Sequence, residues 1–331
     1  MPLARDGAGA AEETERREEL LWREQEAVMW RRKLRTIFGL LAVCIVWLSL
    51  PPTSSAGEEP PESKHFLWQV DSPTGRAYLL GSIHVLDQRV YPLAPVIEEA
   101  FAAANVLVLE ADVFDTPREE LVQSVMAYAT YEPGQTLKNQ LSESDYVALT
   151  GALLEAGIPS DSVQQYRPWF VSLMVDQALE SRLGLRPEYG LDAYFQSKAS
   201  GQKAIEELES VEAQVQMLAG FSDQEQVLMM SSAMEDLEHA AEEFDEMVQI
   251  WQRGDIRAME EQQRKEIQED PGFEPIWKIM IDERNLVMAD RIVTFMETNK
   301  RYFIVVGAAH LVGPQGLVAL LRQRGYTVQQ L

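Results

Sequence analysis

Short apolar runs bounded by turn-forming residues alternate along this chain with longer segments in which apolar positions recur every three or four residues. The first pattern predicts strands and the second predicts helices. Residues 65–70 and 76–80 are predicted strands, and the turn-forming residues 71–75 predict that the two form a hairpin. The run 105–109 is apolar after its first residue, which is typical of a strand buried in a parallel sheet.

Helices are predicted on both sides of this buried strand and dominate the middle of the chain. Ser142 is well placed to cap a helix that ends near Gly157, and Pro168 is well placed to open another. Residues 222–254 are predicted to form one long amphipathic helix. The remaining predicted elements are helices over 95–104, 275–299 and 314–324, strands over 203–207 and 302–306, and a last short strand after Gly325.

The order of these elements is strands first, then many helices, then strand, helix and strand. It predicts an α/β fold, in which a mixed sheet is flanked by helices and interrupted by a helix-rich insertion. No repeat period and no low-complexity tract divides the chain. We therefore predict one domain over 65–331 with a single hydrophobic core, preceded by a linker over 57–64.

An apolar run over 36–50 precedes the predicted domain. It is shorter than the about 20 residues of a membrane-spanning helix. A basic stretch over 31–35 comes before it, and small residues that end at Ala56 come after it. This arrangement is typical of a secretory signal peptide that is cleaved after Ala56. Residues 1–56 are thus predicted to be an N-terminal extension plus signal peptide, or a membrane anchor if cleavage does not occur.

Both alternatives export the remainder of the chain beyond the inner membrane, to the periplasm or the extracellular space, because positive charge stays on the cytoplasmic side. Membrane contact is expected only through the N-terminal segment, with residues 36–50 as the anchor. Met1 and Met29 are both candidate start sites, since Met29 lies just before the basic stretch.

The chain is strongly acidic, with a net charge of −24 over 331 residues. Residues 1–56 hold equal numbers of acidic and basic side chains, so the whole imbalance belongs to the part that follows. A body of this charge repels nucleic acid and anionic lipid, so neither is an expected partner. The simplest interpretation is a solvated acidic surface, and the alternative is that some carboxylates surround a metal ion.

Several common catalytic classes lack their sequence signatures here. Cys44 is the only cysteine and lies in the apolar run, so the domain can form neither a disulfide nor a cysteine metal site. The chain contains no G-x-S-x-G sequence, no G-x-G-x-x-G sequence and no Walker loop. A serine or cysteine nucleophile, cofactor redox chemistry and nucleotide hydrolysis are therefore unsupported.

Two predicted strands end in the same four-residue pattern, glycine followed three residues later by histidine. The first motif runs from Gly81 to His84 and the second from Gly307 to His310. Because the strand ends of an open α/β sheet are where sites are built, we expect the two imidazoles to converge in one pocket. The alternative interpretation is that each is a structural histidine whose hydrogen bonds are already satisfied.

Acidic residues follow two other predicted strands. Glu110 and Asp112 come after the run 105–109, and Glu207 and Glu209 end or follow the run 203–207. Imidazole nitrogens together with carboxylate oxygens are the donor set of a hydrolytic site for a divalent metal ion. Glu110 could instead cap the next helix.

Three further segments complete an ordered set with 81–84, 109–112 and 307–310: Gly190-Leu191-Asp192, Leu208-Glu209-Ser210 with Gln214, and Glu283-Arg284-Asn285. Taken in order, the set resembles the TraB/PrgY/GumN family, whose animal relatives are the TIKI metalloproteases. The resemblance covers roughly residues 65–331 and implies an EreA/ChaN-like α/β fold. It also implies a divalent metal ion, manganese or cobalt, with the two histidines and the first acidic residue at the active centre; zinc suits the same donor set.

Residue by residue, the resemblance implies metal binding by His84 and His310, and metal binding or general-base catalysis by Glu110. Asp192 and Asp112 are candidates for a role behind these ligands, where a carboxylate fixes the tautomer of a histidine. Glu209 is a candidate both for that role and for general-base catalysis.

Arg284 and Asn285 have a chemical rationale of their own. A guanidinium and an amide on one helix edge can hold a carbonyl group or a developing oxyanion. The alternative is a salt bridge of Arg284 with Asp192 or Glu209 that only packs the helix.

The sequence thus predicts an exported metal-dependent hydrolase of peptide or protein substrates, in which Glu110 or Glu209 activates water and Arg284 stabilises charge on the substrate carbonyl. Two alternatives stay open: a non-catalytic protein that binds a ligand in the same pocket, and an envelope accessory factor that works through the acidic helical insertion.

Overall fold

The computed structural model describes residues 64–331, apart from 114–115 and 235–236. The predicted signal peptide or anchor, Cys44 and nearly all of the predicted linker lie outside the described residues. Within the part that is described, no helix is both long and apolar enough to cross a membrane.

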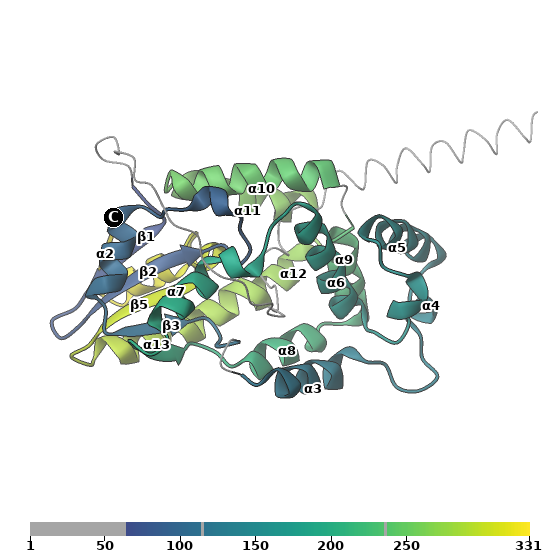
Figure 1. Cartoon of the computed structure of the whole chain (residues 1–331), viewed down its shortest axis with the longest axis horizontal. Coiled ribbons are helices and arrows are strands. Elements are labelled where there is room, and N and C mark those ends of the chain that lie inside the picture. The colour runs from purple at the N-terminus through teal and green to yellow at the C-terminus, as the bar shows by residue number, and fades with distance from the viewer. Residues whose placement is uncertain (1–63, 114–115, 235–236) are drawn as a thin grey trace, which may run out of the picture.

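A mixed six-stranded sheet forms one half of the molecule, and its strands lie in the order β4-β3-β5-β2-β1-β6 (Figure 1). The predicted hairpin is present, because β1 and β2 pair antiparallel around the turn at 72–75. Strands β2, β5, β3 and β4 are mutually parallel, and β6 closes the far edge antiparallel to β1. The strand bounds are β1 Leu67–Asp71, β2 Arg76–Ser82, β3 Val106–Leu109, β4 Ala204–Glu207, β5 Arg301–Gly307 and β6 Thr327–Gln330.

Helices cover this sheet and also build the other half of the molecule, so the predicted α/β class is confirmed. Helices α2 and α7 pack against the parallel strands through a cluster of rings in which Phe101, Phe195 and Phe303 contact one another. The helix bounds are α2 Pro95–Ala103, α3 Arg118–Ala129, α4 Leu137–Gln140, α5 Glu143–Ala156, α6 Pro168–Arg182, α7 Leu191–Ala199, α8 Val211–Gly220, α9 Asp223–Ser232, α10 Leu237–Gln252, α11 Ile256–Glu269, α12 Phe273–Trp277, α13 Arg284–Met296 and α14 Leu317–Gln323.

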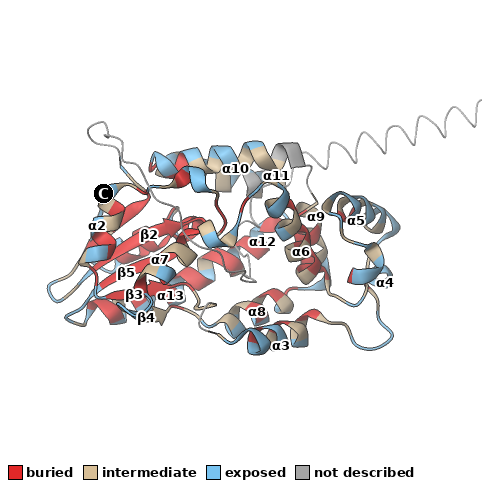
Figure 2. Cartoon of the chain, viewed as in Figure 1, coloured by how far each residue is buried: buried red, intermediate tan, exposed pale blue. Residues whose placement is uncertain are grey.

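The helical insertion has apolar clusters of its own, and the prediction of a single core was wrong. One cluster joins α3, α8, α9 and α12 around Trp169 and Phe273, and a second lies around Leu149 and Val171 between α5 and α6. The largest cluster surrounds the sheet. Figure 2 shows the buried residues concentrated on the strands and on the inward faces of α6, α8 and α13.

Most predicted helix boundaries hold, because the capping chemistry is local. The side chain of Ser142 accepts a hydrogen bond from the N–H of Asp145 at the start of α5, and Gly157 ends that helix with a left-handed φ of 74°. Pro168 opens α6. The last predicted helix begins at Leu317 rather than at 314.

The single helix predicted over 222–254 is instead two, α9 and α10, so this prediction was wrong. Helix α9 starts with a capping box in which Ser222 and Glu225 bond to each other's backbone. Near its end, Ser231 and Ser232 donate their hydroxyls to the carbonyls of Val227 and Met229. Serine side chains that bond to the backbone in this way weaken a helix interior, and an apolar periodicity does not register them.

The predicted helix over 275–299 is present but contains an irregularity. A π-helical turn over Lys278–Glu283 separates α12 from α13, so Arg284 and Asn285 begin a new α-helical segment. Single π turns inside helices are frequent at functional sites.

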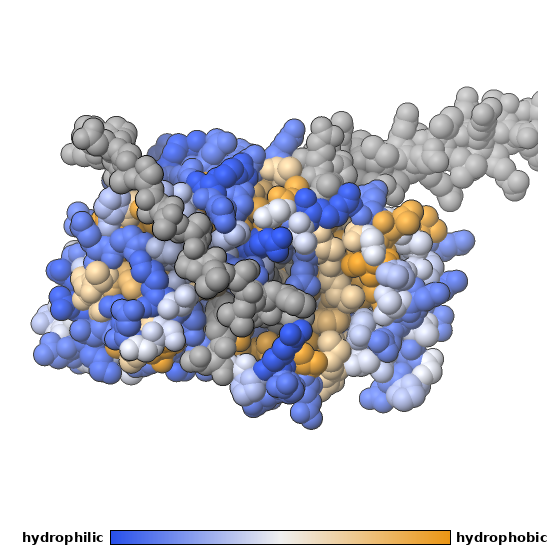
Figure 3. All heavy atoms as spheres, viewed as in Figure 1, coloured by the Kyte–Doolittle hydropathy of each residue, from blue (hydrophilic) through white to orange (hydrophobic). Residues whose placement is uncertain are grey.

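The face of the molecule in Figure 3 is mainly hydrophilic, with apolar side chains gathered over the helical half. On α5, Val147 and Leu154 are largely exposed.

Candidate active site

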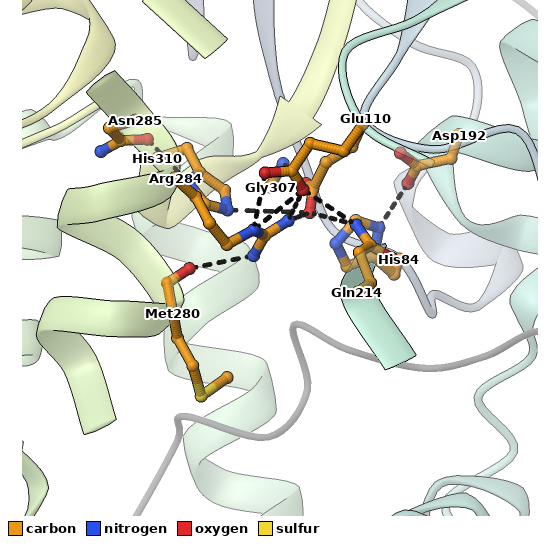
Figure 4. Close-up of polar contacts among 10 residues, drawn as sticks. His84, Glu110, Asp192, Gln214, Met280, Arg284, Asn285, Gly307 and His310 are labelled. Atoms are coloured by element: carbon orange, nitrogen blue, oxygen red, sulfur yellow. Dashed lines mark hydrogen bonds and ion pairs between the residues drawn. The ribbon is translucent and has the colours of Figure 1, made fainter. Parts of the chain in front are cut away.

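The two glycine–histidine motifs lie at the ends of neighbouring parallel strands. In the register of β2 and β5, Ser82 pairs with Gly307, so each motif leaves the sheet at the same level. A Cβ on Gly81 would lie 2.5 Å from the ring of Phe66, so only glycine lets the strand pass this close. Figure 4 shows the side chains of His84 and His310 on either side of Glu110.

Asn285 fixes the tautomer of His310. The amide nitrogen of Asn285 donates to the carbonyl of Gln315 at 2.9 Å, so its oxygen faces Nδ1 of His310 at 2.7 Å. Nδ1 must then carry the proton, which leaves a lone pair on Nε2. Burial lowers the pKa of His310 to about 3, because the nearby charge of Glu110 does not outweigh the loss of water and the positive charges of Arg284 and His84 act in the same direction as burial. His310 is therefore neutral at physiological pH.

Asp192 plays the corresponding part for His84, but with a full negative charge. Its Oδ2 lies 2.8 Å from Nδ1 of His84 and also accepts the hydroxyl of Ser82. Burial acts to lower the pKa of His84, but the charge and hydrogen bond of Asp192 outweigh it and raise the pKa to about 9. Where no metal ion is bound, His84 is therefore a cation at neutral pH.

Asp192 reaches His84 because its chain segment lies directly against the first motif. The N–H of Leu191 donates to the carbonyl of Ile83 at 3.2 Å. A Cβ on Gly190 would lie 1.9 Å from the carbonyl oxygen of His84, so this position requires glycine. The Gly190-Leu191-Asp192 segment is thus a part of the site in space as well as in the sequence motif.

Glu110 lies at the centre of the site and accepts several hydrogen bonds. Its Oε2 accepts the N–H of Gly307 at 3.1 Å, and its Oε1 accepts the guanidinium of Arg284 and the amide of Gln214. Burial alone would raise the pKa of Glu110, but the charge of Arg284 outweighs it and holds the pKa well below its usual range. Glu110 is therefore an ionised carboxylate although it is buried.

Arg284 forms ion pairs with both Glu110 and Glu209, the two carboxylates that are predicted to activate water. Its Nε and Nη2 donate to Oε2 of Glu209 at 2.9 and 2.7 Å, and its Nη1 donates to the carbonyl of Met280 at 2.9 Å, within the π turn. Of the two roles predicted for Arg284, the ion pair with Glu209 is present in this structure, with Glu110 as a second partner. A contact with a substrate carbonyl stays a prediction.

The donor atoms fit a divalent metal ion in chemical type. Both histidines have Nδ1 engaged and Nε2 left as the ligand nitrogen, which is the arrangement of metal-binding histidines. Nε2 of His310 lies 3.7 Å from Oε1 of Glu110, so two electron-rich atoms face each other. Among the described residues, however, no three histidine, cysteine, aspartate or glutamate side chains are already gathered closely enough to hold an ion.

Asp112 contacts β4 and α7. Its N–H donates to Glu207 at 3.1 Å, and its carboxylate accepts from Gln196 at 3.3 Å. A role of Asp112 behind the histidines stays a prediction.

Sequence reasoning missed Glu180, near the end of α6. Burial raises the pKa of Glu180 to about 7. The charge of His84 acts against this rise, so the two groups interact electrostatically. Nothing local marks this residue among the other acidic positions of the insertion, because only the fold brings α6 up to the first motif.

The fold and the site together define a class of protein: an α/β protein that holds two histidines and a buried Arg–Glu cluster at the carboxyl ends of its parallel strands. The chain matches the TraB/PrgY/gumN family over residues 66–330. It therefore belongs to this family.

Relatives of two kinds are similar to this chain. The uncharacterised protein YbaP of Escherichia coli (strain K12) is 26% identical over 266 residues, which cover 78% of this chain and 94% of YbaP. A metalloprotease TIKI homolog of Nematostella vectensis is 25% identical over 319 residues, covering 80% of this chain and 66% of that protein. Metalloprotease TIKI2 of Danio rerio is 24% identical and is covered over 60% of its length. No solved structure matches the chain significantly.

Proposed function

We propose that this protein is a metal-dependent hydrolase of peptide bonds, in which His84, His310 and Glu110 hold the metal ion. The observation that carries the proposal is the pair of tautomer-fixing contacts, from Asp192 and from Asn285, which leave Nε2 of each motif histidine to a ligand. The names of the TIKI relatives support the reaction class.

When bound, such an ion would polarise the substrate carbonyl and acidify a water molecule. The protein's own residues supply the remaining parts. Glu110 and Glu209 are the candidates to accept the proton of the water; the depressed pKa of Glu110 keeps it ionised, as a metal ligand must be, but makes it a weak base. Arg284 stabilises negative charge that develops on the substrate, provided that one of its carboxylate contacts is released.

The metal content of the purified protein shows whether an ion is bound and whether it is manganese, cobalt or zinc. A peptide library incubated with added Mn²⁺ then tests cleavage. We expect about one bound ion and manganese-dependent cleavage, and His310→Ala should lose both, because one ligand is gone. His65→Ala is the control, since His65 belongs to neither motif and the contacts described for it are made by its backbone N–H and carbonyl.

Glu110→Gln separates charge from shape. It keeps the volume of the side chain but removes its negative charge, and we expect cleavage to fall by at least about 100-fold, as for loss of a general base. Glu132→Gln, at an exposed position, should leave cleavage unchanged. Full activity in Glu110→Gln would contradict the proposal.

A non-catalytic binding protein is the second candidate, and the occupation of Glu110 by Arg284 favours it. Such a protein would bind a metal ion or another ligand in the same pocket without turning over any peptide. Stoichiometric metal with no cleavage across the library would support this candidate over the hydrolase.

The cellular side of the proposal is export, with the acidic body in the periplasm or outside the cell and peptides or proteins as substrates. The basic stretch, the apolar run 36–50 and the small residues before Gly57 support it. N-terminal sequencing of the mature protein tests it, with Gly57 as the expected first residue. An intact Met1 or Met29 in the membrane fraction would indicate an anchor instead.

A further inference from the structure

Helices α10 and α11 form a hairpin whose tip is fixed to the edge of the sheet. Gly254, in the turn, has a left-handed φ of 60°, and a Cβ there would lie 2.5 Å from the carbonyl oxygen of Lys64. The amide of Gln330 on β6 donates both to the carbonyl of Gly254 at 2.8 Å and to that of His65 at 2.9 Å. The tip is therefore held against the strands β1 and β6.

The first arm of this hairpin contacts the first motif. The indole nitrogen of Trp251, near the end of α10, donates to the carbonyl of Gly81 at 2.6 Å, and both groups are buried. Gly81 is the glycine that begins the motif leading to His84. A few residues beyond His84, the exposed side chain of Arg89 pairs with Asp245 of α10 at 2.9 Å.

The second arm contacts the loop of the second motif. Oε1 of Glu260 on α11 accepts the N–H of Gly313 at 3.0 Å. Gly313 has a left-handed φ of 81° and lies in the loop that follows His310. Each arm of one anchored hairpin thus contacts one of the two histidine loops.

We propose that the α10–α11 hairpin sets the separation of the two motif loops, with Trp251 as a positioning residue for His84 and Glu260 as one for His310. The proposal rests on the proposed function in so far as the two histidines act together. Physically, a buried carbonyl or N–H that loses its partner destabilises its loop until another partner is found. Each contact therefore restrains its loop, and the hairpin gives both loops a common reference.

The test uses the full-length protein labelled with ¹⁵N in its histidines, of which the chain has four. Trp251→Phe removes the indole N–H while keeping an aromatic ring, and Glu260→Ala removes the acceptor of Gly313. We expect Trp251→Phe to move the ring signals of His84 and to leave those of His310 in place. Glu260→Ala should do the opposite, and Glu260→Gln, which keeps an acceptor oxygen, should restore the wild-type signals.

Trp68→Phe is the matched control for Trp251→Phe. Trp68 is fully buried in the same apolar cluster, and its indole nitrogen has no hydrogen-bond partner within the described residues. The two variants lose similar packing, but only Trp251→Phe loses a hydrogen bond. If Trp68→Phe moved the signals of His84 as much, or if neither hairpin variant moved its own histidine, the proposal would be overturned.

Mn²⁺ titration separates this proposal from the proposed function. If both hold, each hairpin variant should bind Mn²⁺ about 10–100-fold more weakly, as for residues that orient metal ligands. Selective movement of the histidine signals in a protein that binds no Mn²⁺ would support the hairpin and contradict the metal site. Tight Mn²⁺ binding in the wild type and in both variants, with unmoved histidine signals, would support the metal site and contradict the role of the hairpin.

Discussion

The two motif loops have the same sequence pattern and leave the sheet side by side, yet their histidines differ in charge. His84 faces the carboxylate of Asp192 and has a pKa raised to about 9, whereas His310 faces the amide of Asn285 and has a pKa lowered to about 3. The motif therefore sets where each imidazole lies, and the balance of burial and nearby charge sets its protonation: the charge of Asp192 outweighs burial at His84, whereas burial outweighs the charge of Glu110 at His310. With one cationic and one neutral histidine, the site limits the positive charge placed next to Arg284.

The largest expected effect comes from removing Arg284, the cation that holds the two carboxylates between the loops. Arg284→Gln would leave Glu110 and Glu209 as buried carboxylates without their cation. Losing one partner of a buried ion pair typically costs about 3–5 kcal/mol, and we expect the free energy of unfolding in urea to fall by this amount. Arg324→Gln, which breaks the surface pair with Asp290, should cost less than about 1 kcal/mol. Equal losses would show that the central cluster is solvated.

Asp192→Asn would make the first loop resemble the second. Burial would then act on His84 without its strongest opposing charge, with only the weaker effect of Glu110 against it, so we expect its pKa to fall from about 9 to below its ordinary value of 6.5. Histidine NMR titration measures the change. Asp71→Asn, in an exposed pair with Arg76, is the control and should leave His84 unchanged. A pKa that stays near 9 would show that another group charges His84.

Gly190→Ala would disturb the first loop by sterics alone, because the new Cβ meets the carbonyl of His84. Forcing an extra methyl group into such a contact typically costs about 1–3 kcal/mol, measurable by urea unfolding. Gly151→Ala is the control: nothing lies within 4 Å of its Cβ, and in the interior of α5 alanine should stabilise slightly. If both substitutions had the same effect, the close approach at Gly190 would not exist in solution.

The smallest expected effect is on the pH dependence of the free energy of unfolding, to which the two histidines should contribute on opposite sides of pH 6.5. His310 has a folded-state pKa below 6.5, so its contribution is present above pH 6.5 and is lost as the pH falls towards about 3. His84 has a raised pKa, so its contribution is present below pH 6.5 and is lost as the pH rises through about 9. Each slope is at most about 1.4 kcal/mol per pH unit.

Urea unfolding between pH 5 and pH 9 measures both slopes. We expect His310→Gln to flatten the acid side of the stability profile and His84→Gln to flatten the alkaline side. Flattening on the same side in both variants would mean that the two loops do not differ in protonation.

The sequence predicted the strands, the hairpin and the shared edge of the two motifs because each depends on local chemistry. Turn residues, apolar runs and capping serines act within a few residues of one another. A salt bridge of Arg284 with Glu209 was one of two predicted alternatives. The sequence could not predict that Glu110 would be a second partner of Arg284, or that Asn285 would bond to His310 rather than face a substrate. These pairings depend on the angle at which α13 meets the sheet, and no local pattern encodes that angle.

The same limit explains the residues that were missed. The missed residues, Trp251, Glu260 and Glu180, all lie on helices of the long insertion. In the sequence, each is far from the motif loop that it approaches in the fold. Their residue types are common on helices. The split between α9 and α10 was missed for a different reason, since the serines that end α9 do not interrupt the amphipathic pattern.

The π turn over Lys278–Glu283 makes the site sensitive to helical phase. A π turn holds one residue more than an α turn, so it completes the same rotation with one extra residue. If the same residues formed an unbroken α-helix instead, the segments on either side would be rotated relative to each other by about 100°, the angle between successive residues of an α-helix. Arg284 and Asn285 could not keep their present directions while Ile276 stayed packed in its cluster. The π turn therefore sets the direction in which Arg284 and Asn285 face the site, and the same side chains on a regular helix would not form it.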